Sequence, residues 1–165
     1  MGAKHITFHS GYRPKPYIKY YKEWLENSIE TFRKVIDMTE KEGMVVTVEN
    51  AFEKTPELLI KLVEAINSLN FKLCFDCGHY NAFAKMPPLD MLAMLPPGRI
   101  GEVHLSDNDG SDDQHLALGE GNIDLDSLFT KIEELKINPV FTLEPKDITG
   151  AEHDLAYLKS KGLIG

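Results

Sequence analysis

The chain has 165 residues, of which 42% are hydrophobic and 27% charged, and its formal net charge is −8. This composition is typical of one globular domain, which we expect to span residues 1–165. The acidic balance argues against broad, non-specific binding to nucleic acid, because such binding depends on Lys and Arg neutralising phosphates.

Sequence features of membrane or secreted proteins are missing. No apolar run reaches the roughly 18 residues that a membrane span needs, and the N-terminal stretch lacks the apolar segment of a secretory signal. The two cysteines, Cys74 and Cys77, are too close in sequence to join distant parts of a fold. We therefore expect a cytoplasmic protein that makes no contact with a membrane.

Short β-like runs alternate with amphipathic helical stretches along the chain. Strands are predicted at 4–9, 44–48, 71–75, 99–105 and 139–143. Helices are predicted at 20–42, from 55 to about 69, and at 88–95, 125–135 and 150–161. The second helix should begin at Thr55, with a proline at the first helical position. This alternation predicts a parallel sheet with right-handed crossovers.

The number of strand–helix units limits the architectures that the chain can form. Five units in 165 residues correspond to about 33 residues each, and eight such units would need about 260, close to the size of a (β/α)8 barrel. The fold class we expect is therefore α/β, an incomplete parallel barrel of the TIM type with about five of eight β/α units. A five-stranded doubly wound sheet is the structural alternative.

Each predicted strand ends in an acid or a histidine. In chain order these residues are His9, Glu49, Asp76 with His79 three positions on, His104 and Glu144. The carboxyl ends of parallel strands form the functional edge of such folds. In the loop after the fourth strand, Asp113 and His115 would point the same way in extended backbone. Mixed carboxylate and imidazole ligands suit Zn or Mn, so we predict a divalent-metal site at this edge.

The motifs around these residues resemble a known superfamily. They are HSG at His9, VEN at Glu49, DCGH from Asp76, HLSDNDG from His104, DQHLALGEG from Asp113 and LEP at Glu144. Their order resembles the xylose-isomerase-like TIM barrels, which include AP endonuclease family 2 proteins such as endonuclease IV and many sugar phosphate isomerases and epimerases. The resemblance covers nearly the whole chain and matches the C-terminal five-eighths of that barrel.

The resemblance implies one to three ions at the barrel mouth. It identifies Glu49, Asp76, His104 and Glu144 as the shared metal ligands. It identifies His9, His79, Asp113 and His115 as additional ligands of the multi-metal, endonuclease-like members. A further histidine ligand of the nuclease branch has no counterpart, because this sequence contains nothing that matches the first three strands.

Three functions are consistent with these residues. The leading one is a divalent-metal-dependent sugar or sugar-phosphate isomerase or epimerase, in which Glu49 and Glu144 transfer a proton through a metal-stabilised enediolate. The alternative is an endonuclease IV-like, zinc-dependent apurinic/apyrimidinic endonuclease that hydrolyses phosphodiesters, and only this alternative involves nucleic acid. The third is a truncated, non-catalytic metal-binding remnant. The acidic charge and the lack of an extended basic face favour the isomerase.

The short length leaves two edges of the predicted sheet without a neighbour. The strands that carry His9 and Glu144 would both lie at open edges, which proteins seldom leave unprotected. Either the chain is a shortened gene product, or a homo-oligomer covers these edges.

Several other residues were considered for a functional role. His79, Arg13 and Lys15 are candidate substrate contacts. Arg13 and Lys15, with Lys19 and nearby tyrosines, form the only basic and aromatic patch, and an ordinary solvated loop explains this patch better than a binding site for a sugar phosphate or a nucleic-acid backbone. We expect Cys74 and Cys77 to be packing residues, His5 to be structural and His153 to lie on the surface. Glu102 should face the same side of its strand as His104, as a buried acid that needs a partner.

Overall fold

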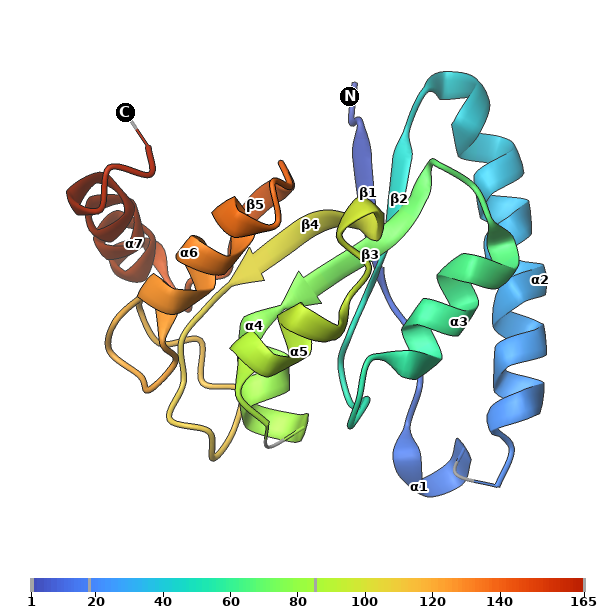
Figure 1. Cartoon of the computed structure of the whole chain (residues 1–165), viewed down its shortest axis with the longest axis horizontal. Helices are drawn as coiled ribbons and strands as arrows, with labels where there is room; N and C mark the ends of the chain where they lie inside the picture. The colour runs from blue at the N-terminus through green and yellow to red at the C-terminus, as the bar shows by residue number, and fades with distance from the viewer. Residues whose placement is uncertain (1, 18, 85, 165) are drawn as a thin grey trace.

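The computed structural model describes residues 2–17, 19–84 and 86–164. Its centre is a sheet of five parallel strands, shown in Figure 1: β1 (His5–His9), β2 (Val45–Glu49), β3 (Phe71–Asp76), β4 (Ile100–Leu105) and β5 (Val140–Leu143). The strands follow one another in sequence order, β1-β2-β3-β4-β5. A doubly wound sheet would reverse its strand order at one point. The sheet is therefore a half-barrel, as the predicted incomplete TIM-type barrel requires.

Helices lie between successive strands and after the last one, with α4 at the carboxyl end of β3 (Figure 1). The helices are α1 (Pro14–Tyr17), α2 (Tyr21–Thr39), α3 (Glu57–Ile66), α4 (Cys77–His79), α5 (Pro88–Met94), α6 (Leu125–Glu134) and α7 (Ile148–Ser160). Helices α2 and α3 pack together on one flank, and α5 contacts α6. Within the described ranges, no helix is long and apolar enough to cross a membrane.

The core lies between the sheet and these helices. Alternate strand residues such as Val46, Val48 and Phe75 are fully buried and pack with helix residues such as Leu62 and Met91. Complete burial of each large apolar side chain stabilises the fold by about 1.5–3 kcal/mol. Because strand residues alternate between faces, the other face of the same strands carries the polar side chains that form the candidate site.

Two local predictions were wrong. Thr55 does not cap α3: the helix begins at Glu57, and the carbonyl of Pro56 accepts the first helical hydrogen bond from Ile60 N at 3.0 Å. The helix ends at Ile66, before the predicted end near 69, because Asn67 adopts the left-handed conformation (φ 51°) that closes helices.

The segment after β3 is helical, although no helix was predicted between residues 75 and 88. Helix α4 continues into a π-helix at Tyr80–Ala84. The Asp76 side chain caps α4 by accepting a hydrogen bond from His79 N at 2.6 Å. This capping bond places the two side chains of the DCGH motif at the carboxyl end of β3, where the candidate site lies.

Candidate metal centre

Four of the predicted ligands meet at the carboxyl ends of the strands. Glu49, Asp76, His104 and Glu144 each offer one ligand atom, and these atoms lie within 4.8 Å of one another. The strand register brings them together: Asp76 is paired with His104 across β3 and β4, and Glu144 N donates a hydrogen bond to Leu105 O at 3.0 Å.

One nitrogen lies at the centre of this first group. His104 Nδ1 is 3.0 Å from Glu144 Oε1, 3.5 Å from Glu49 Oε1 and 3.8 Å from Asp76 Oδ2. Glu49, Asp76 and His104 are buried, whereas the Glu144 side chain is 27% exposed. The group therefore opens to solvent on the side of Glu144.

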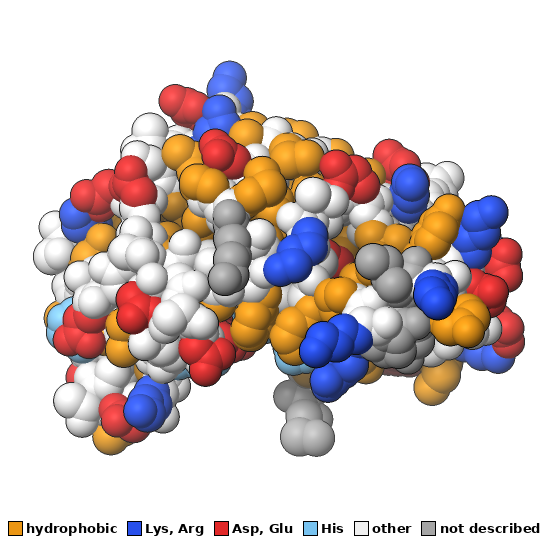
Figure 2. Space-filling model, turned by 90° about the horizontal axis from the view of Figure 1, so that it is seen from below, with side chains coloured by type: hydrophobic (Ala, Val, Ile, Leu, Met, Phe, Trp, Pro, Cys, Tyr) orange, Lys and Arg blue, Asp and Glu red, His pale blue; other side chains and the backbone are white. Residues whose placement is uncertain are grey.

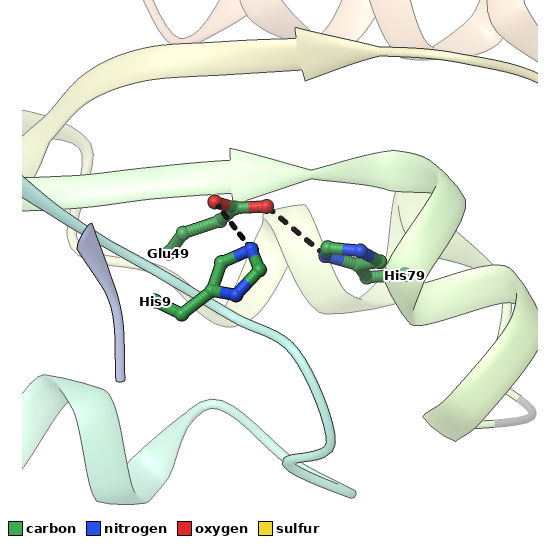
Figure 3. Close-up of side chains that lie close together, drawn as sticks. All are labelled: His9, Glu49 and His79. Atoms are coloured by element: carbon green, nitrogen blue, oxygen red, sulfur yellow. Dashed lines mark ion pairs between the residues drawn. The ribbon is translucent and has the colours of Figure 1, made fainter. Parts of the chain in front are cut away.

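His9, Glu49 and His79 form a second group that shares Glu49 with the first. Figure 3 shows the Glu49 carboxylate between the two imidazole rings, with His9 Nε2 3.2 Å from Oε2 and His79 Nδ1 3.1 Å from Oε1. The His9 side chain is 63% exposed. Glu49 thus lies where one carboxylate can bridge two ion positions.

Asp113 and His115 extend from the loop after β4 to the edge of the second group. Asp113 Oδ2 is 3.2 Å from His79 Nε2 and 3.1 Å from His115 Nε2. His115 Nδ1 lies 2.8 Å from the carbonyl oxygen of Glu144. The two loop residues therefore lie side by side at the edge of the centre, although His115 adopts the left-handed conformation (φ 49°) and not the extended backbone on which the prediction was based.

The charges of the centre are strongly coupled. Burial raises the pKa of Asp76 to about 7, although the positive charge of His79 opposes this. Burial would likewise raise the pKa of Glu49, but the close approach of His104 and His79, whose Nδ1 atoms lie 3.5 and 3.1 Å from Oε1, outweighs burial and lowers that pKa to about 2. Burial would lower the pKa of His79, yet its bonds to Asp113 and Glu49 raise it to about 11. A carboxylate cluster of this density holds its imidazoles as cations unless a metal ion replaces the protons.

Unpartnered buried atoms indicate that a divalent ion fits here. Among the described residues, Glu49 Oε1, His104 Nδ1 and Asp113 Oδ1 are buried and have no hydrogen-bond partner. Buried polar atoms are normally satisfied, so such atoms need a ligand to explain them. Carboxylate oxygens with imidazole nitrogens form the donor set that Zn and Mn accept. The buried His, Glu and Asp groups are therefore suited to hold metal.

The candidate substrate contacts Arg13 and Lys15 remain outside these groups. The Arg13 guanidinium lies 5.6 Å from the centre of the Phe52 ring, and Lys15 is exposed on α1. Among the described contacts, neither forms a hydrogen bond or an ion pair with a candidate ligand. Their role in substrate binding stays a prediction.

Asn50 of the VEN motif also belongs to the centre, although it was not predicted to do so. Its amide accepts a hydrogen bond from Asp76 N at 2.9 Å and donates one to Asp76 O at 3.0 Å. The backbone carbonyl oxygen of Asn50 lies 2.8 Å from His79 Nδ1. Asn50 thus fixes the end of β2 to the end of β3.

The predictions for residues outside the centre agree with the structure. Cys74 and Cys77 are buried and form no disulfide. His153 is exposed on α7, and His5 is half-buried in β1.

Comparison with known proteins identifies the family. A family profile described as "Xylose isomerase-like TIM barrel" matches residues 1–161, so this chain belongs to that family. The uncharacterized protein MJ1311 of Methanocaldococcus jannaschii is 33% identical over an alignment of 167 positions, which covers 96% of this chain and 56% of that protein.

Solved structures agree with this assignment. A D-tagatose 3-epimerase-like protein is 30% identical with a TM-score of 0.85, over 97% of this chain and 63% of that one. The IOLI protein, solved with a binding zinc atom, is 18% identical with a TM-score of 0.72, over 98% of this chain and 62% of that one. The chain therefore spans a little over half the length of the proteins it matches.

Proposed function

We propose that this half-barrel carries the metal and proton-transfer site of a divalent-metal-dependent sugar or sugar-phosphate isomerase or epimerase. The observation that carries the proposal is the convergence of Glu49 and Glu144 on one ring nitrogen, His104 Nδ1, at 3.5 and 3.0 Å. Removal and return of a carbon-bound proton require two such groups close to the reacting carbon.

The chain's own residues have separate roles in this proposal. Glu49, Asp76, His104 and Glu144 would hold the ion, with zinc or manganese as the best matches to the donor set. The ion would neutralise the negative charge that develops on a sugar carbonyl oxygen as the neighbouring C–H proton leaves. The pKa values of Glu49 and Glu144 are both lowered, so both carboxylates are ionised in the metal-free chain. Glu49 would accept the substrate proton and later release it to solvent, and the partly exposed Glu144 would take a proton from solvent water and return it to the carbon.

The relatives support the choice of substrate class. A protein that is 30% identical is described as D-tagatose 3-epimerase-like, and zinc is bound in the IOLI structure. Because the chain spans only 56–63% of the proteins compared, the activity and substrates of the whole protein are part of the proposal.

Exchange of a substrate proton with solvent deuterium tests this proposal directly. The chain is loaded with Mn or Zn and incubated with D-tagatose in heavy water, and loss of the C3 proton signal is followed by NMR. We expect Glu49→Gln and Glu144→Gln each to slow exchange by about 10²–10⁴-fold. The matched control is Glu120→Gln, which makes the same change at an exposed loop position and should leave the rate unchanged. Absence of exchange by the metal-loaded wild type with every ketose tested would reject the isomerase.

A second candidate function rests on Asp113. Its contacts with His79 and His115 place an acid and two imidazoles beside the first group, which suits a multi-metal, endonuclease IV-like phosphodiesterase. Against this, the face in Figure 2 shows acidic and basic side chains interspersed, with no continuous basic surface for a phosphate backbone. Incision of a duplex at an abasic site by the zinc-loaded chain would favour the nuclease, and metal binding without either reaction would favour the non-catalytic remnant.

A further inference from the structure

A buried carboxylate lies directly beneath the candidate metal centre. Glu102 is on β4, two residues before His104, and is 5% exposed. Its side chain lies on the same face of the sheet as the candidate metal ligands, closer to the amino ends of the strands. No hydrogen-bond partner of this acid was predicted from the sequence, and the structure shows three hydroxyl partners.

The partners are threonine hydroxyls from three other strands. Thr142 of β5 donates to Glu102 Oε1 at 2.6 Å, and Thr47 of β2 donates to Oε2 at 2.9 Å. Thr7 of β1 also donates to Oε2 and lies 2.8 Å from the Thr47 hydroxyl. A carboxylate accepts about four hydrogen bonds, so these three fix its orientation and leave one acceptor position. Glu102 is thus held by β1, β2 and β5 at once.

The remaining acceptor position faces His104. Glu102 Oε1 lies 3.4 Å from His104 Nε2, while the other ring nitrogen, Nδ1, faces Glu49, Asp76 and Glu144. A neutral imidazole carries its proton on one nitrogen and has a lone pair on the other. A carboxylate beside Nε2 favours the tautomer with the proton there, which leaves the Nδ1 lone pair facing the other carboxylates.

We propose that Glu102 is a positioning residue of the metal centre, which holds His104 as the Nε2–H tautomer and aims Nδ1 at the ion. The threonines extend this role across the half-barrel, because they tie the position of the carboxylate to strands β1, β2 and β5. The inference rests on the proposed function only in taking His104 as a metal ligand. It adds a residue that acts through that ligand without touching metal or substrate.

The same side chains have a competing interpretation. Cys74, Glu102 and His104 also offer atoms within 4.8 Å of one another, as a separate metal site would. However, hydroxyl groups occupy three of the roughly four acceptor positions of Glu102 and the fourth faces His104 Nε2, so none is left for an ion. The geometry favours positioning over ligation, and a cysteine variant separates the two.

Zinc affinity is the first measurement. Zn²⁺ alone is titrated into the metal-free chain against a chromogenic chelator, and the dissociation constant is compared between wild type and Glu102→Gln. Loss of such an outer partner weakens metal binding by about 10–100-fold, and we expect a change in this range. The matched control is Asp154→Asn, the same acid-to-amide change at another buried acid, whose described partner is Leu118 N at 2.7 Å. The control should bind zinc as the wild type does.

The tautomer of His104 is the second measurement, and a merely structural role would not change it. In ¹⁵N-labelled, zinc-loaded protein, the ring-nitrogen shifts should report a proton on Nε2 in the wild type and a mixed or reversed tautomer in Glu102→Gln. Thr142→Val removes one anchor of the carboxylate without changing its charge, and should give an intermediate effect on both readouts. It also keeps the test decisive if Glu102→Gln does not fold.

The outcomes separate this inference from the proposed function. If the wild type binds no zinc, the metal centre and the positioning role are both rejected. If it binds zinc and Glu102→Gln and Thr142→Val match it in affinity and tautomer, only the positioning role is rejected. Equal weakening by Asp154→Asn would show a general loss of stability and would also reject that role. A loss of zinc in Cys74→Ser as large as in Glu102→Gln would support the thiol-containing site instead.

Discussion

His79 contacts Asp113 with one ring nitrogen, and its other ring nitrogen faces Glu49 in the centre of the site. Asp113 Oδ2 lies 3.2 Å from His79 Nε2, and Glu49 Oε1 lies 3.1 Å from His79 Nδ1. A loop after β4 is thereby linked to a carboxylate at the end of β2. Because Asp113 Oδ1 has no hydrogen-bond partner among the described residues, this link contains an acceptor that an ion would satisfy.

The first prediction concerns a second ion. Asp113→Asn should weaken binding of the second zinc ion by about 10–100-fold, because it removes a negative charge beside His79, while the first ion keeps its four ligands. Isothermal titration calorimetry with Zn²⁺ resolves the two steps. Asp112→Asn, which makes the same change at the exposed neighbouring position, is the control. Equal loss of both ions would contradict the division into two groups.

The second prediction concerns the pH dependence of the metal-free chain. The pKa of His79 is raised from 6.5 to about 11, so its protonation stabilises the fold fully below about pH 6.5, and this contribution is lost as the pH rises toward 11. In the presence of a chelator, the free energy of unfolding in urea should therefore fall between about pH 7 and about pH 10. His79→Asn should reduce this slope, whereas His153→Asn, at an exposed site, should not. Identical slopes in all three proteins would show that His79 is not held as a cation.

Much of this arrangement was predictable because the end of each strand can be recognised from the local sequence. Each ligand candidate ends a recognisable strand, and parallel pairing aligns strand ends, so Asp76 and His104 become neighbours without any knowledge of the loops. The partners of Glu102 were not predictable in this way. They come from β1, β2 and β5, and only the curvature of the sheet brings their hydroxyls to one carboxylate.

Local errors arose where common sequence signals did not match the local structure. Thr55 precedes proline and acid, a common cap pattern, yet the helix uses the Pro56 carbonyl instead. The stretch after Asp76 contains glycine and polar residues that suggest a loop. The stretch is nevertheless helical. Glycine is needed at Gly78 because an added Cβ would meet Asn108 Nδ2 at 3.3 Å and the Ser106 side chain still closer.

The third prediction concerns the loop that presents Asp113 and His115. The buried Asp107 carboxylate accepts hydrogen bonds from the backbone N–H groups of Gly119 and Gly121 at 3.0 Å each, and from Ile123 at 3.2 Å. A Cβ on Gly121 would contact the Asp107 carboxylate and approach Asn108 N to 2.6 Å.

Gly121→Ala should therefore lower the free energy of unfolding by about 1–3 kcal/mol, the usual cost of overpacking. Gly98→Ala is the matched control, since nothing lies within 4 Å of its Cβ position, and its effect should stay within about 0.5 kcal/mol. Urea unfolding of both variants measures the difference. Equal stability of the two would contradict the close packing of this loop around Asp107.

The fourth prediction concerns the two outer strands. In the described part of the sheet, β1 pairs only with β2, and β5 pairs only with β4. Apolar side chains are exposed on both strands, with Phe8 at 38%, Val140 at 42% and Phe141 at 43%. Unpaired edges with apolar side chains favour association, so the isolated chain should form a homo-oligomer through them.

Sedimentation velocity over a range of protein concentrations tests this association. Phe141→Lys should raise the dissociation constant at least about tenfold, because a charge on the edge of β5 opposes pairing with another strand. Met38→Lys introduces the same charge on α2, at a side chain that is 75% exposed and outside both outer strands, and should leave association unchanged. A wild-type chain that stays monomeric at every concentration would show that the edges are tolerated without a partner. Equal weakening by both variants would show that net charge, and not the β5 edge, controls association.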